Sequence, residues 1–311
     1  MNPGLKNNTA SNQKQLVEIT AKHPPALLTA AQIWERIPSR KPDTHKGTYG
    51  RVLAVCGCAE YRGAAALCTL GALCSGAGLV TLAASELVIN SIAGRILEAT
   101  FLPLPDPEAL IDELRRATVC AAGCGKKTDE DTRREMRLAL AHAAGTVVLD
   151  AGGLCSLAQS PLTPADCAGL LSSCAGRLII TPHPGEMARL TGTSVSQILQ
   201  TPASTAAEYA TRTGAVVVLK GHRTRIAAPD GQLYENRTGN AGLARGGSGD
   251  ILTGIIAGLA AQGLSPLDAA LCGVWLHGSA ADRCARRKSV MGMLPEDILE
   301  DLGHIFLENG H

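Results

Sequence analysis

A glycine-rich segment that ends in an acidic residue has the clearest chemical meaning in this chain. Residues 238–250 read TGNAGLARGGSGD, and an apolar stretch, residues 251–261, follows directly. Glycine backbones take up positive φ angles and approach ligands closely, and the N–H groups at a helix start bind anions. A carboxylate there can act as a base beside a phosphate. The segment predicts an anion site with Asp250 as catalytic base; the alternative is a turn in which Asp250 only caps a helix.

Other polar or glycine-containing segments precede this one, and most of them follow a predicted strand. They are His45-Lys46-Gly47-Thr48-Tyr49-Gly50, Tyr61-Arg62-Gly63-Ala64, Val147-Val148-Leu149-Asp150-Ala151, Thr181-Pro182-His183-Pro184-Gly185-Glu186 and Val218-Leu219-Lys220-Gly221. In this order, and together with residues 240–250, they resemble the NAD(P)H-hydrate dehydratase family of the ribokinase-like superfamily. The resemblance runs from about residue 45 to the C-terminus, and an ordered set of matches is more specific than any single motif.

The resemblance implies an enzyme that repairs nicotinamide cofactors whose ring has been hydrated. The ring hydroxyl of the S-epimer is phosphorylated, with ADP or ATP as donor and Mg²⁺ as cofactor, and elimination of phosphate then restores NADH or NADPH. The family's common partner, an epimerase domain, has no room in 311 residues, so a stand-alone dehydratase is expected. The sequence leaves open which nucleotide is the donor and which hydrated cofactor is preferred.

The resemblance also assigns roles to single residues. Asp250 is the expected catalytic base and touches the substrate. The other expected substrate-binding residues are Ala64, Gly123 and His183. The expected nucleotide-binding residues are Lys220, Gly221, His222, Arg223, Thr224, Gly246, Gly247, Ser248 and Gly249. No residue is assigned as a metal ligand, and Glu186 is interpreted as an acid favoured by a helix N-terminus.

Each assignment has a purely structural alternative. Residues 220–224 could form a solvated basic turn. His183, which lies between two prolines, could cap or pack a helix. Ala64 could be small only because two helices pack tightly there.

The chain departs from the family pattern at several places. Ala121-Ala122 stands where the family usually has Gly-Pro, Gly152 stands where it usually has a second aspartate, and Arg245 replaces a small residue beside the anion site. These departures motivate one alternative function, a non-catalytic nucleotide sensor. A second alternative is a kinase of the same superfamily that phosphorylates a vitamin-precursor alcohol.

Composition and charge exclude further function classes. The formal net charge is +1 and aromatic residues make up 3% of the chain, so neither a basic surface nor stacking rings for nucleic acid are expected. The 11 cysteines show no C-x-x-C pair, which argues against zinc. Without an apolar signal segment, a reducing, cytoplasmic setting with free thiols is expected. The expected partner is the hydrated cofactor, in a homo-oligomer that does not enter a membrane.

The elements that position these residues follow from the hydrophobic pattern. Residues 1–25 are polar and predict a disordered leader, and residues 26–311 predict the dehydratase domain. The uncharged stretch 63–85 is interpreted as a buried helix and strand and not as a membrane span. Strands alternating with helices predict an α/β fold, a three-layer ribokinase-like architecture whose mainly parallel sheet has helices on both faces. The expected strands are 51–55, 79–83, 119–122, 147–149, 178–181, 216–219 and the hairpin 225–228 with 232–235. The expected helices are 29–35, 64–74, 129–144, 184–192, 251–261 and 267–284.

Overall fold

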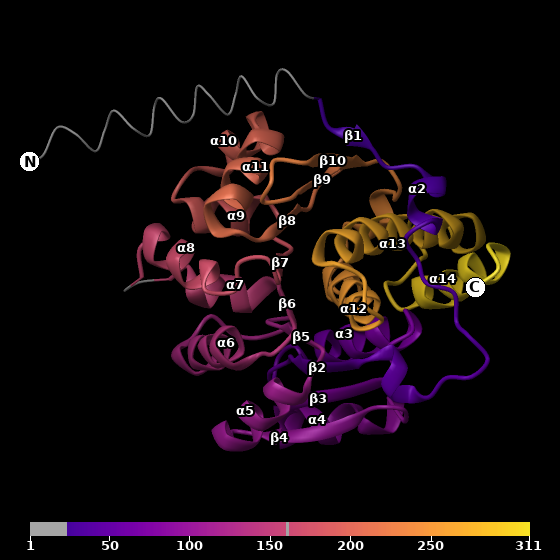
Figure 1. The fold of residues 1–311 in the computed structure, drawn as a ribbon, viewed down its shortest axis with the longest axis horizontal. Helices are drawn as coiled ribbons and strands as arrows, with labels where there is room; N and C mark the ends of the chain where they lie inside the picture. The colour runs from indigo at the N-terminus through magenta and orange to yellow at the C-terminus, as the bar shows by residue number, and fades with distance from the viewer. Residues whose placement is uncertain (1–23, 160–161) are drawn as a thin grey trace, which may run out of the picture.

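The computed structural model describes residues 24–159 and 162–311. All but the last two residues of the expected leader therefore lie outside the described residues. One ten-stranded sheet runs through the described chain in the order β1-β10-β9-β8-β7-β6-β5-β2-β3-β4 (Figure 1). The strands are β1 (Ala26–Leu27), β2 (Arg51–Val55), β3 (Leu79–Ser85), β4 (Thr100–Leu104), β5 (Val119–Ala122), β6 (Thr146–Leu149), β7 (Leu178–Ile180), β8 (Val216–Leu219), β9 (Thr224–Ala227) and β10 (Leu233–Asn236).

The sheet is mainly parallel, as predicted. The seven neighbouring strands β8, β7, β6, β5, β2, β3 and β4 all run in the same direction. Only β9 is antiparallel to its two neighbours, β8 and β10. Crossover helices connect the parallel strands and must lie on the faces of the sheet. The predicted α/β class with a mainly parallel sheet is confirmed.

Helices cover both faces of the sheet (Figure 1). One layer holds α2 (Ala30–Trp34), α3 (Arg62–Cys74), α4 (Glu86–Ile92), α12 (Ser248–Ala261), α13 (Pro266–Lys288) and α14 (Asp297–Glu308). The other holds α5 (Pro107–Arg116), α6 (Glu130–His142), α7 (Ala151–Leu157), α8 (Pro164–Ser172), α9 (Pro184–Thr191), α10 (Val195–Gln200) and α11 (Pro202–Thr213). Three 3₁₀ turns lie between them: η1 (Lys46–Tyr49), η2 (Ala93–Arg95) and η3 (Ala241–Leu243).

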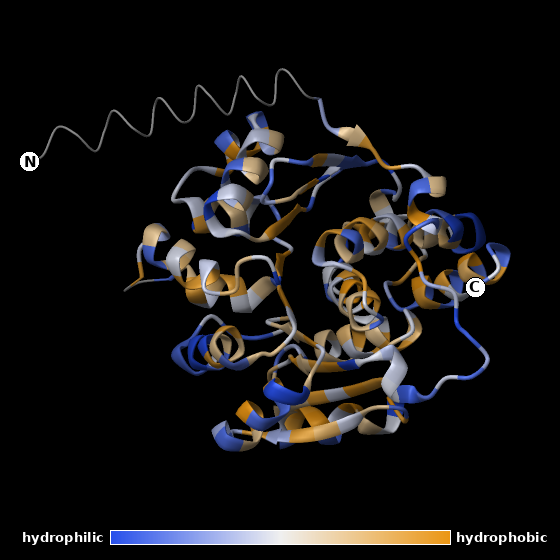
Figure 2. Ribbon diagram, viewed as in Figure 1, coloured by the Kyte–Doolittle hydropathy of each residue, from blue (hydrophilic) through white to orange (hydrophobic). Residues whose placement is uncertain are grey.

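Alternation along the strands supplies one hydrophobic core on each face. In β2, Val52 and Ala54 face the α3 and α12 layer, whereas Leu53 and Val55 face the α6 and α7 layer. Side chains of a strand alternate in this way, so a strand buried on both faces reads as a continuous apolar run. Figure 2 shows strands β2 to β4 largely in the hydrophobic colours.

Every strand and helix expected from the sequence is present, with small shifts of the ends. Thr29 caps α2 and Asp129 caps α6 through side-chain hydrogen bonds. Helix α12 begins at Ser248, three residues before the expected start, so Asp250 lies inside its first turn. Among the described residues no helix is long and apolar enough to cross a membrane; the uncharged stretch is α3 and β3.

The expected list misses strands β1 and β4 and the helices α4, α5, α7, α8, α10, α11 and α14. Strand β4 shows the reason. It contains Pro103, which cannot donate to a sheet. It lies at the edge of the sheet and bonds only to β3, where a missing donor is tolerated.

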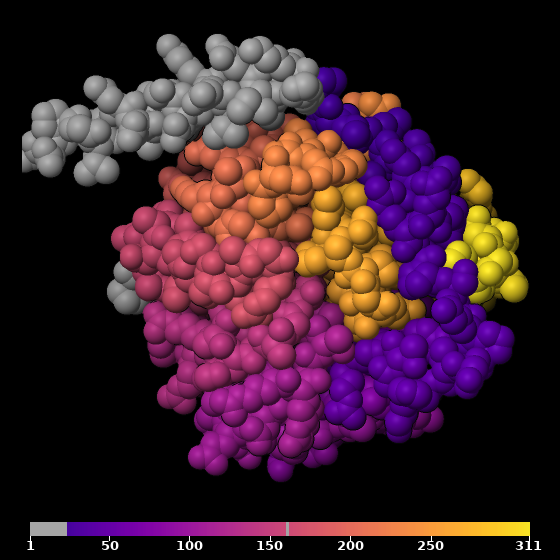
Figure 3. Space-filling view, viewed as in Figure 1, coloured from indigo at the N-terminus to yellow at the C-terminus, as the bar shows by residue number. Residues whose placement is uncertain are grey.

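The two ends of the described chain pack together. Trp34 of α2 lies edge-on to Trp275 of α13 and to Phe306 of α14, with ring centroids 6.1 and 6.2 Å apart. Arg36 Nε lies 2.8 Å from Asp268 Oδ1. Figure 3 shows the indigo N-terminal segment lying against the yellow C-terminal helix. These contacts join the N-terminal segment to the α13 and α14 layer.

Candidate active site

The candidate site lies where the order of the strands reverses. From β2 the chain proceeds outward through β3 to β4, and it then returns to β5 on the other side of β2 and continues to β8. Ligands of open α/β sheets bind beyond the carboxyl ends of the strands at such a point. This edge holds the segments that follow β5, β6, β7 and β8. Helices α3 and α12 begin at the same edge.

The first turn of α12 has free N–H groups. The residue before the helix, Gly247, has φ 102°, and no side chain caps the helix. In the described part of the chain, the N–H groups of Gly246, Gly247, Gly249 and Asp250 have no acceptor. The Ser248 hydroxyl is buried and has no hydrogen-bond partner there either. Because unpaired donors at a helix start attract an anion, this turn can hold a phosphate group.

Close packing against α3 fixes the position of this turn. A Cβ atom on Gly254 would lie 2.1 Å from the Cys68 carbonyl oxygen, and one on Gly71 would lie 2.7 Å from the Ile251 carbonyl oxygen. The two helices therefore touch backbone to backbone, which only glycine allows here. Such packing leaves little freedom for α12 to move relative to α3.

An ion pair and a threonine that bonds to it lie beside this turn. Lys220 Nζ, after β8, donates to Asp150 Oδ1 at 2.7 Å, and Thr253 Oγ1 of α12 donates to Asp150 Oδ2 at 3.0 Å. Asp150 is only 1% exposed. A Cβ on Gly249 would lie 3.3 Å from Lys220 Nζ and 3.5 Å from Asp150 Oδ2. The ammonium therefore lies next to the unpaired N–H groups, where a phosphate would meet both.

The first turn of α9, by contrast, is capped by its own side chains. His183 Nδ1 accepts from the Gly185 and Glu186 N–H groups at 3.0 and 3.3 Å, and Glu186 accepts from the His183 N–H at 2.7 Å. This is a capping box, with histidine in the place of the usual hydroxyl residue. The His183 ring is about half exposed and its Nε2 lies 3.4 Å from Glu186 Oε1. Glu186 Oε2 lies 3.9 Å from Lys220 Nζ, which connects α9 to the group around Asp150.

Burial shifts the proton affinities of several groups of the site. It raises the pKa of Asp250 to about 9, with Cys124 and Asp150 adding to the shift and Lys220 opposing it. It raises the pKa of Glu186 to about 7, again against the Lys220 charge. It lowers the pKa of His277, which lies under the α12 turn, to about 4, and the Lys220 charge adds to this. Raised carboxyl pKa values are typical of functional sites. A pKa of about 9 keeps Asp250 protonated at neutral pH in the ligand-free protein, so it serves as a base only in its ionised form.

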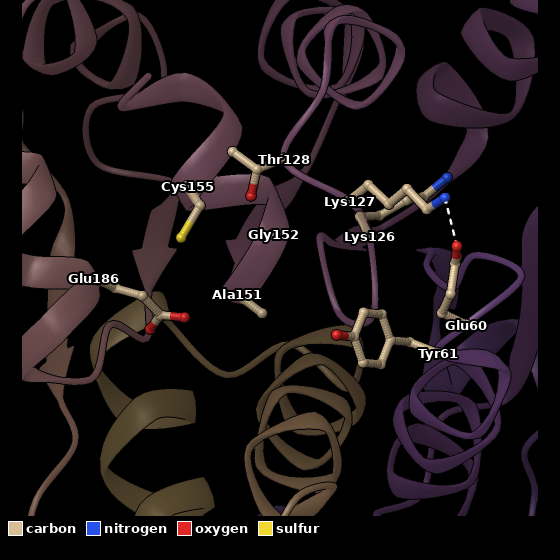
Figure 4. A pocket seen from close by; sticks show the side chains of 9 residues that line it. All are labelled: Glu60, Tyr61, Lys126, Lys127, Thr128, Ala151, Gly152, Cys155 and Glu186. Atoms are coloured by element: carbon tan, nitrogen blue, oxygen red, sulfur yellow. Dashed lines mark ion pairs between the residues drawn. The ribbon is translucent and has the colours of Figure 1, made fainter. Parts of the chain in front are cut away.

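An open cleft of about 450 Å³ adjoins these groups. Figure 4 shows Glu186 and Cys155 on one side of it and Tyr61 and Glu60 on the other. The residues that line it are Glu60, Tyr61, Lys126, Lys127, Thr128, Ala151, Gly152, Cys155 and Glu186. Ala151, directly after Asp150, has φ 48°, a strained conformation that occurs most often at functional sites.

Sequence reasoning missed several of these lining residues, for two reasons. Lys126 stands in Gly125-Lys126-Lys127-Thr128, which departs from the phosphate-loop pattern because Lys127 occupies the place of Ser or Thr, and its Nζ lies 2.6 Å from Glu135 Oε2 at the cleft wall. Ala151 carries no polar group, and only its backbone angle distinguishes it. Asp150 and Glu186 can be identified from the sequence, because Asp150 directly follows β6 and Glu186 lies in the first turn of α9, the helix after β7.

The structure brings some of the predicted residues together and separates others. Lys220 and the α12 turn 246–250 lie together, and His183 joins them through Glu186. The turn after Lys220 points elsewhere: Gly221 and His222 are exposed, and Arg223 lies 3.8 Å from Glu235. Thr224 Oγ1 bonds within this turn, to the backbone of Gly221. In sequence these residues form one group with Lys220; in space only Lys220 faces Asp150.

Two small residues predicted to contact substrate also have structural reasons to be small. A Cβ on Gly123, whose φ is 106°, would lie 2.2 Å from the Asp150 carbonyl oxygen. A Cβ on Gly125 would lie 2.6 Å from Ala64 Cβ, so a larger residue at position 64 would press on this loop. Packing between the loop after β5 and its neighbours therefore requires small residues here whatever ligand binds.

Comparison with known proteins connects this geometry to a family. The family described as NAD(P)H-hydrate dehydratase matches residues 52–303. The chain is 42% identical over 289 residues to a bifunctional NAD(P)H-hydrate repair enzyme of Moorella thermoacetica, covering 90% of this chain and 53% of that protein. It spans about half the length of such bifunctional relatives.

Relatives of similar length match over nearly their whole length. An ADP-dependent (S)-NAD(P)H-hydrate dehydratase of Bacillus subtilis is 35% identical over 281 residues, covering 89% of this chain and 96% of that protein. A crystal structure of the Bacillus subtilis ADP/ATP-dependent NAD(P)H-hydrate dehydratase, co-crystallised with ATP and Mg²⁺, superimposes with a TM-score of 0.78 at 32% identity, covering 92% of this chain and 99% of that chain. The fold is ribokinase-like, as predicted.

Proposed function

The chain belongs to the NAD(P)H-hydrate dehydratase family, and from this premise we propose that it converts the S-epimer of hydrated NADH and NADPH back to NADH and NADPH, driven by ADP or ATP. The observation that carries the proposal is the uncapped start of α12. It puts unpaired N–H groups, the Lys220 ammonium and the Asp250 carboxyl at one edge of the sheet.

In the proposed reaction, Asp250 takes the proton of the ring hydroxyl. The hydroxyl oxygen forms a bond to the terminal phosphorus of the nucleotide, and the bond from that phosphorus to the bridging oxygen breaks, which releases AMP from ADP or ADP from ATP. The ring carbon then loses its bond to the phosphorylated oxygen, inorganic phosphate leaves, and a neighbouring ring carbon gives up a proton as the double bond forms again. Phosphoryl transfer depends on positioning and on neutralising charge. The N–H groups of 246–249 and Lys220 supply both.

The remaining sites follow the same division. We assign the nucleotide phosphates to Lys220 and to residues 246–249, and the rest of the nucleotide to the turn from Gly221 to Thr224, which is largely exposed and points away from Asp150. We assign the hydrated ring to Ala64, Gly123, His183 and Asp250. Support for the second group comes from the capped α9 turn: His183 Nδ1 is held by the backbone N–H groups, and its ring is about half exposed beside Glu186, where a substrate polar group can reach it.

Mg²⁺ fits this site as the ion of the nucleotide. Mg²⁺ keeps several waters and binds through one or two carboxylates together with substrate phosphates. Both oxygens of Asp150 already accept hydrogen bonds, from Lys220 and Thr253, so this carboxylate has no free oxygen for a metal ion. The nucleotide phosphates and water would hold the ion beside Lys220, and the ion would neutralise phosphate charge.

One assay tests the proposal. The protein is incubated with hydrated NADH and either ADP or ATP, and recovery of the dihydronicotinamide absorbance is followed together with release of inorganic phosphate. Equal amounts of both products are expected, and an Asp250→Asn control should form them at least about a hundredfold more slowly. A phosphorylated product that stays intact would indicate an alcohol kinase, and nucleotide binding without turnover would indicate a sensor; either result rejects the proposal.

We also propose a cytoplasmic homo-oligomer. The 11 free cysteines agree with a reducing compartment. Exposed apolar side chains such as Met291, Leu294 and Leu97, which are 87%, 52% and 80% exposed, offer surface for a second copy. Sedimentation velocity would test the assembly, and a monomer at micromolar concentration would reject it.

A further inference from the structure

Three cysteines far apart in the sequence meet behind the candidate base. Cys56 follows β2, Cys68 lies in α3, and Cys124 follows β5. All three are fully buried, and their Sγ atoms lie within 4.8 Å of one another. In the described part of the chain this is the one group of three histidine, cysteine or acidic side chains close enough to share a metal ion. We call it the cysteine cluster.

The fold itself produces the cluster. Strands β2 and β5 are neighbours, with Val55 opposite Ala122, so the residues after each strand lie side by side. The Gly57 N–H donates to the Cys124 carbonyl at 2.8 Å, which holds the two loops together. Helix α3 then crosses over this junction and brings Cys68 to it. Because rigid backbone contacts set the three sulfur positions, the cluster is formed before any ligand binds.

We propose that the cysteine cluster is a binding site for one thiophilic d¹⁰ cation, of the class of Zn²⁺, Cd²⁺ or Cu⁺, held by three thiolate sulfurs. Thiolates are soft ligands that select these ions. A metal–sulfur bond of about 2.3 Å places three sulfurs in a plane about 4.0 Å apart. The observed limit of 4.8 Å is within an ångström of that spacing, so side-chain rotations suffice. Each thiol that binds gives up its proton to solvent.

One acidic side chain adjoins the cluster. The carboxyl of Asp250 is hydrogen-bonded to Cys124 and is partly exposed. We assign the fourth position of the site to this carboxylate, since aspartate oxygens are zinc ligands. Zinc sites of this type usually have four ligands.

Cadmium titration of the reduced protein tests the proposal without any activity assay. The full chain is treated with a phosphine reductant and titrated with Cd²⁺, and the thiolate-to-metal charge-transfer absorption is recorded. One equivalent should saturate the signal. Cys68→Ala should weaken binding by about a hundredfold or more, since even loss of an outer-shell partner costs 10–100-fold. The matched control is Cys120→Ala, a buried cysteine of β5 that faces the other core, and it should behave like the unmodified protein.

A second measurement needs no variant. X-ray absorption of the protein loaded with one equivalent of Zn²⁺ should show three sulfur neighbours at about 2.3 Å. Absence of a charge-transfer signal in the unmodified protein, an equal signal from Cys68→Ala, or fewer than three sulfur neighbours would each overturn the site. These readouts are independent of the dehydratase reaction, so they remain decisive if the proposed function fails.

Discussion

Two helices, α9 and α12, begin at the same edge of the sheet, and they treat their first N–H groups differently. At α9, the His183 side chain accepts hydrogen bonds from two N–H groups of the first turn, and the Glu186 side chain accepts one from the His183 N–H. At α12, Gly247 stands before the helix and no side chain caps it. Both helices have the same partial positive charge at this end. The difference lies in whether the N–H groups of the first turn already have hydrogen-bond acceptors.

The comparison teaches how an anion site can be recognised. A helix start whose donors are satisfied gives stability, whereas one whose donors are free gives affinity for a ligand. The α12 turn keeps its donors free because glycines stand where capping residues usually stand. Close backbone packing between α3 and α12 keeps the uncapped turn in place.

The largest effect is expected from changing the acid of the open turn. Asp250→Asn keeps the shape of the side chain and removes its basicity, so kcat should fall by about 10²–10⁴-fold. Binding of ADP should survive, because the N–H groups and Lys220 are unchanged. Steady-state turnover and calorimetry measure the two quantities. Near-normal turnover would end the assignment of Asp250 as base.

The next effect concerns the cation beside the open turn. Lys220→Ala should weaken binding of ADP or ATP roughly ten- to hundredfold, since charge-assisted hydrogen bonds contribute about 1.5–3 kcal/mol. The hydrated cofactor should bind with much less change, held by the residues around His183. Titration of each ligand measures this, with Lys288→Ala, an exposed lysine paired with Asp297, as control. Equal weakening of both ligands would contradict two separate subsites.

A larger side chain in the first turn of α12 should weaken nucleotide binding about tenfold without unfolding the protein. In Gly249→Val the new side chain would point at Lys220 Nζ and Asp150 Oδ2, into space that a phosphate needs. Gly303→Val is the matched control, because position 303 also lies in a helix and faces open space. Calorimetry with ADP compares the two variants. If both bind ADP like the unmodified protein, the turn does not hold phosphate.

A smaller effect, in pH dependence, comes from the capped turn. Burial raises the pKa of Glu186 to about 7 from 4.5, so between these values the folded protein binds more protons than the unfolded chain. Stability from this group is therefore complete below about pH 4.5 and is lost as the pH rises through 7. The free energy of unfolding of Glu186→Gln should equal that of the unmodified protein at pH 5 and exceed it by about 1–3 kcal/mol at pH 8. Urea unfolding at both pH values measures this, and a difference that does not change with pH would be contrary to it.

The smallest effect separates the two helix starts directly. His183→Ala removes the cap of α9 and should lower the free energy of unfolding by about 1 kcal/mol. Ser248→Ala, in the first turn of α12, should change it by less than about 0.5 kcal/mol, because the Ser248 hydroxyl makes no hydrogen bond among the described residues. Denaturant unfolding of the unliganded variants compares them. Equal losses would show that Ser248 acts as a cap.

Local features of the site could be predicted, and those that depend on distant residues could not. The glycines before Asp250 announce a turn because backbone freedom is a property of the residue itself. The residues of the turn 220–224 are adjacent in sequence and are predicted as one group, yet in the structure Lys220 pairs with Asp150 and Arg223 lies beside Glu235. Successive side chains at the end of a strand point in different directions. The backbone conformation sets the direction of each side chain, and the order of residues alone does not show it.

The sequence by itself determined the α/β class, the alternation of strands and helices, and the glycine-rich start of α12, because each depends on the order of nearby residues. The tertiary structure decided the rest. Lys220 and Asp150 are 70 residues apart, and Thr253 is 103 residues from Asp150. The cysteines of the cluster have no motif spacing. Such groups form where the strand order places β2, β5, β6 and β8 side by side, and hydrophobic periodicity identifies a strand without stating its neighbours.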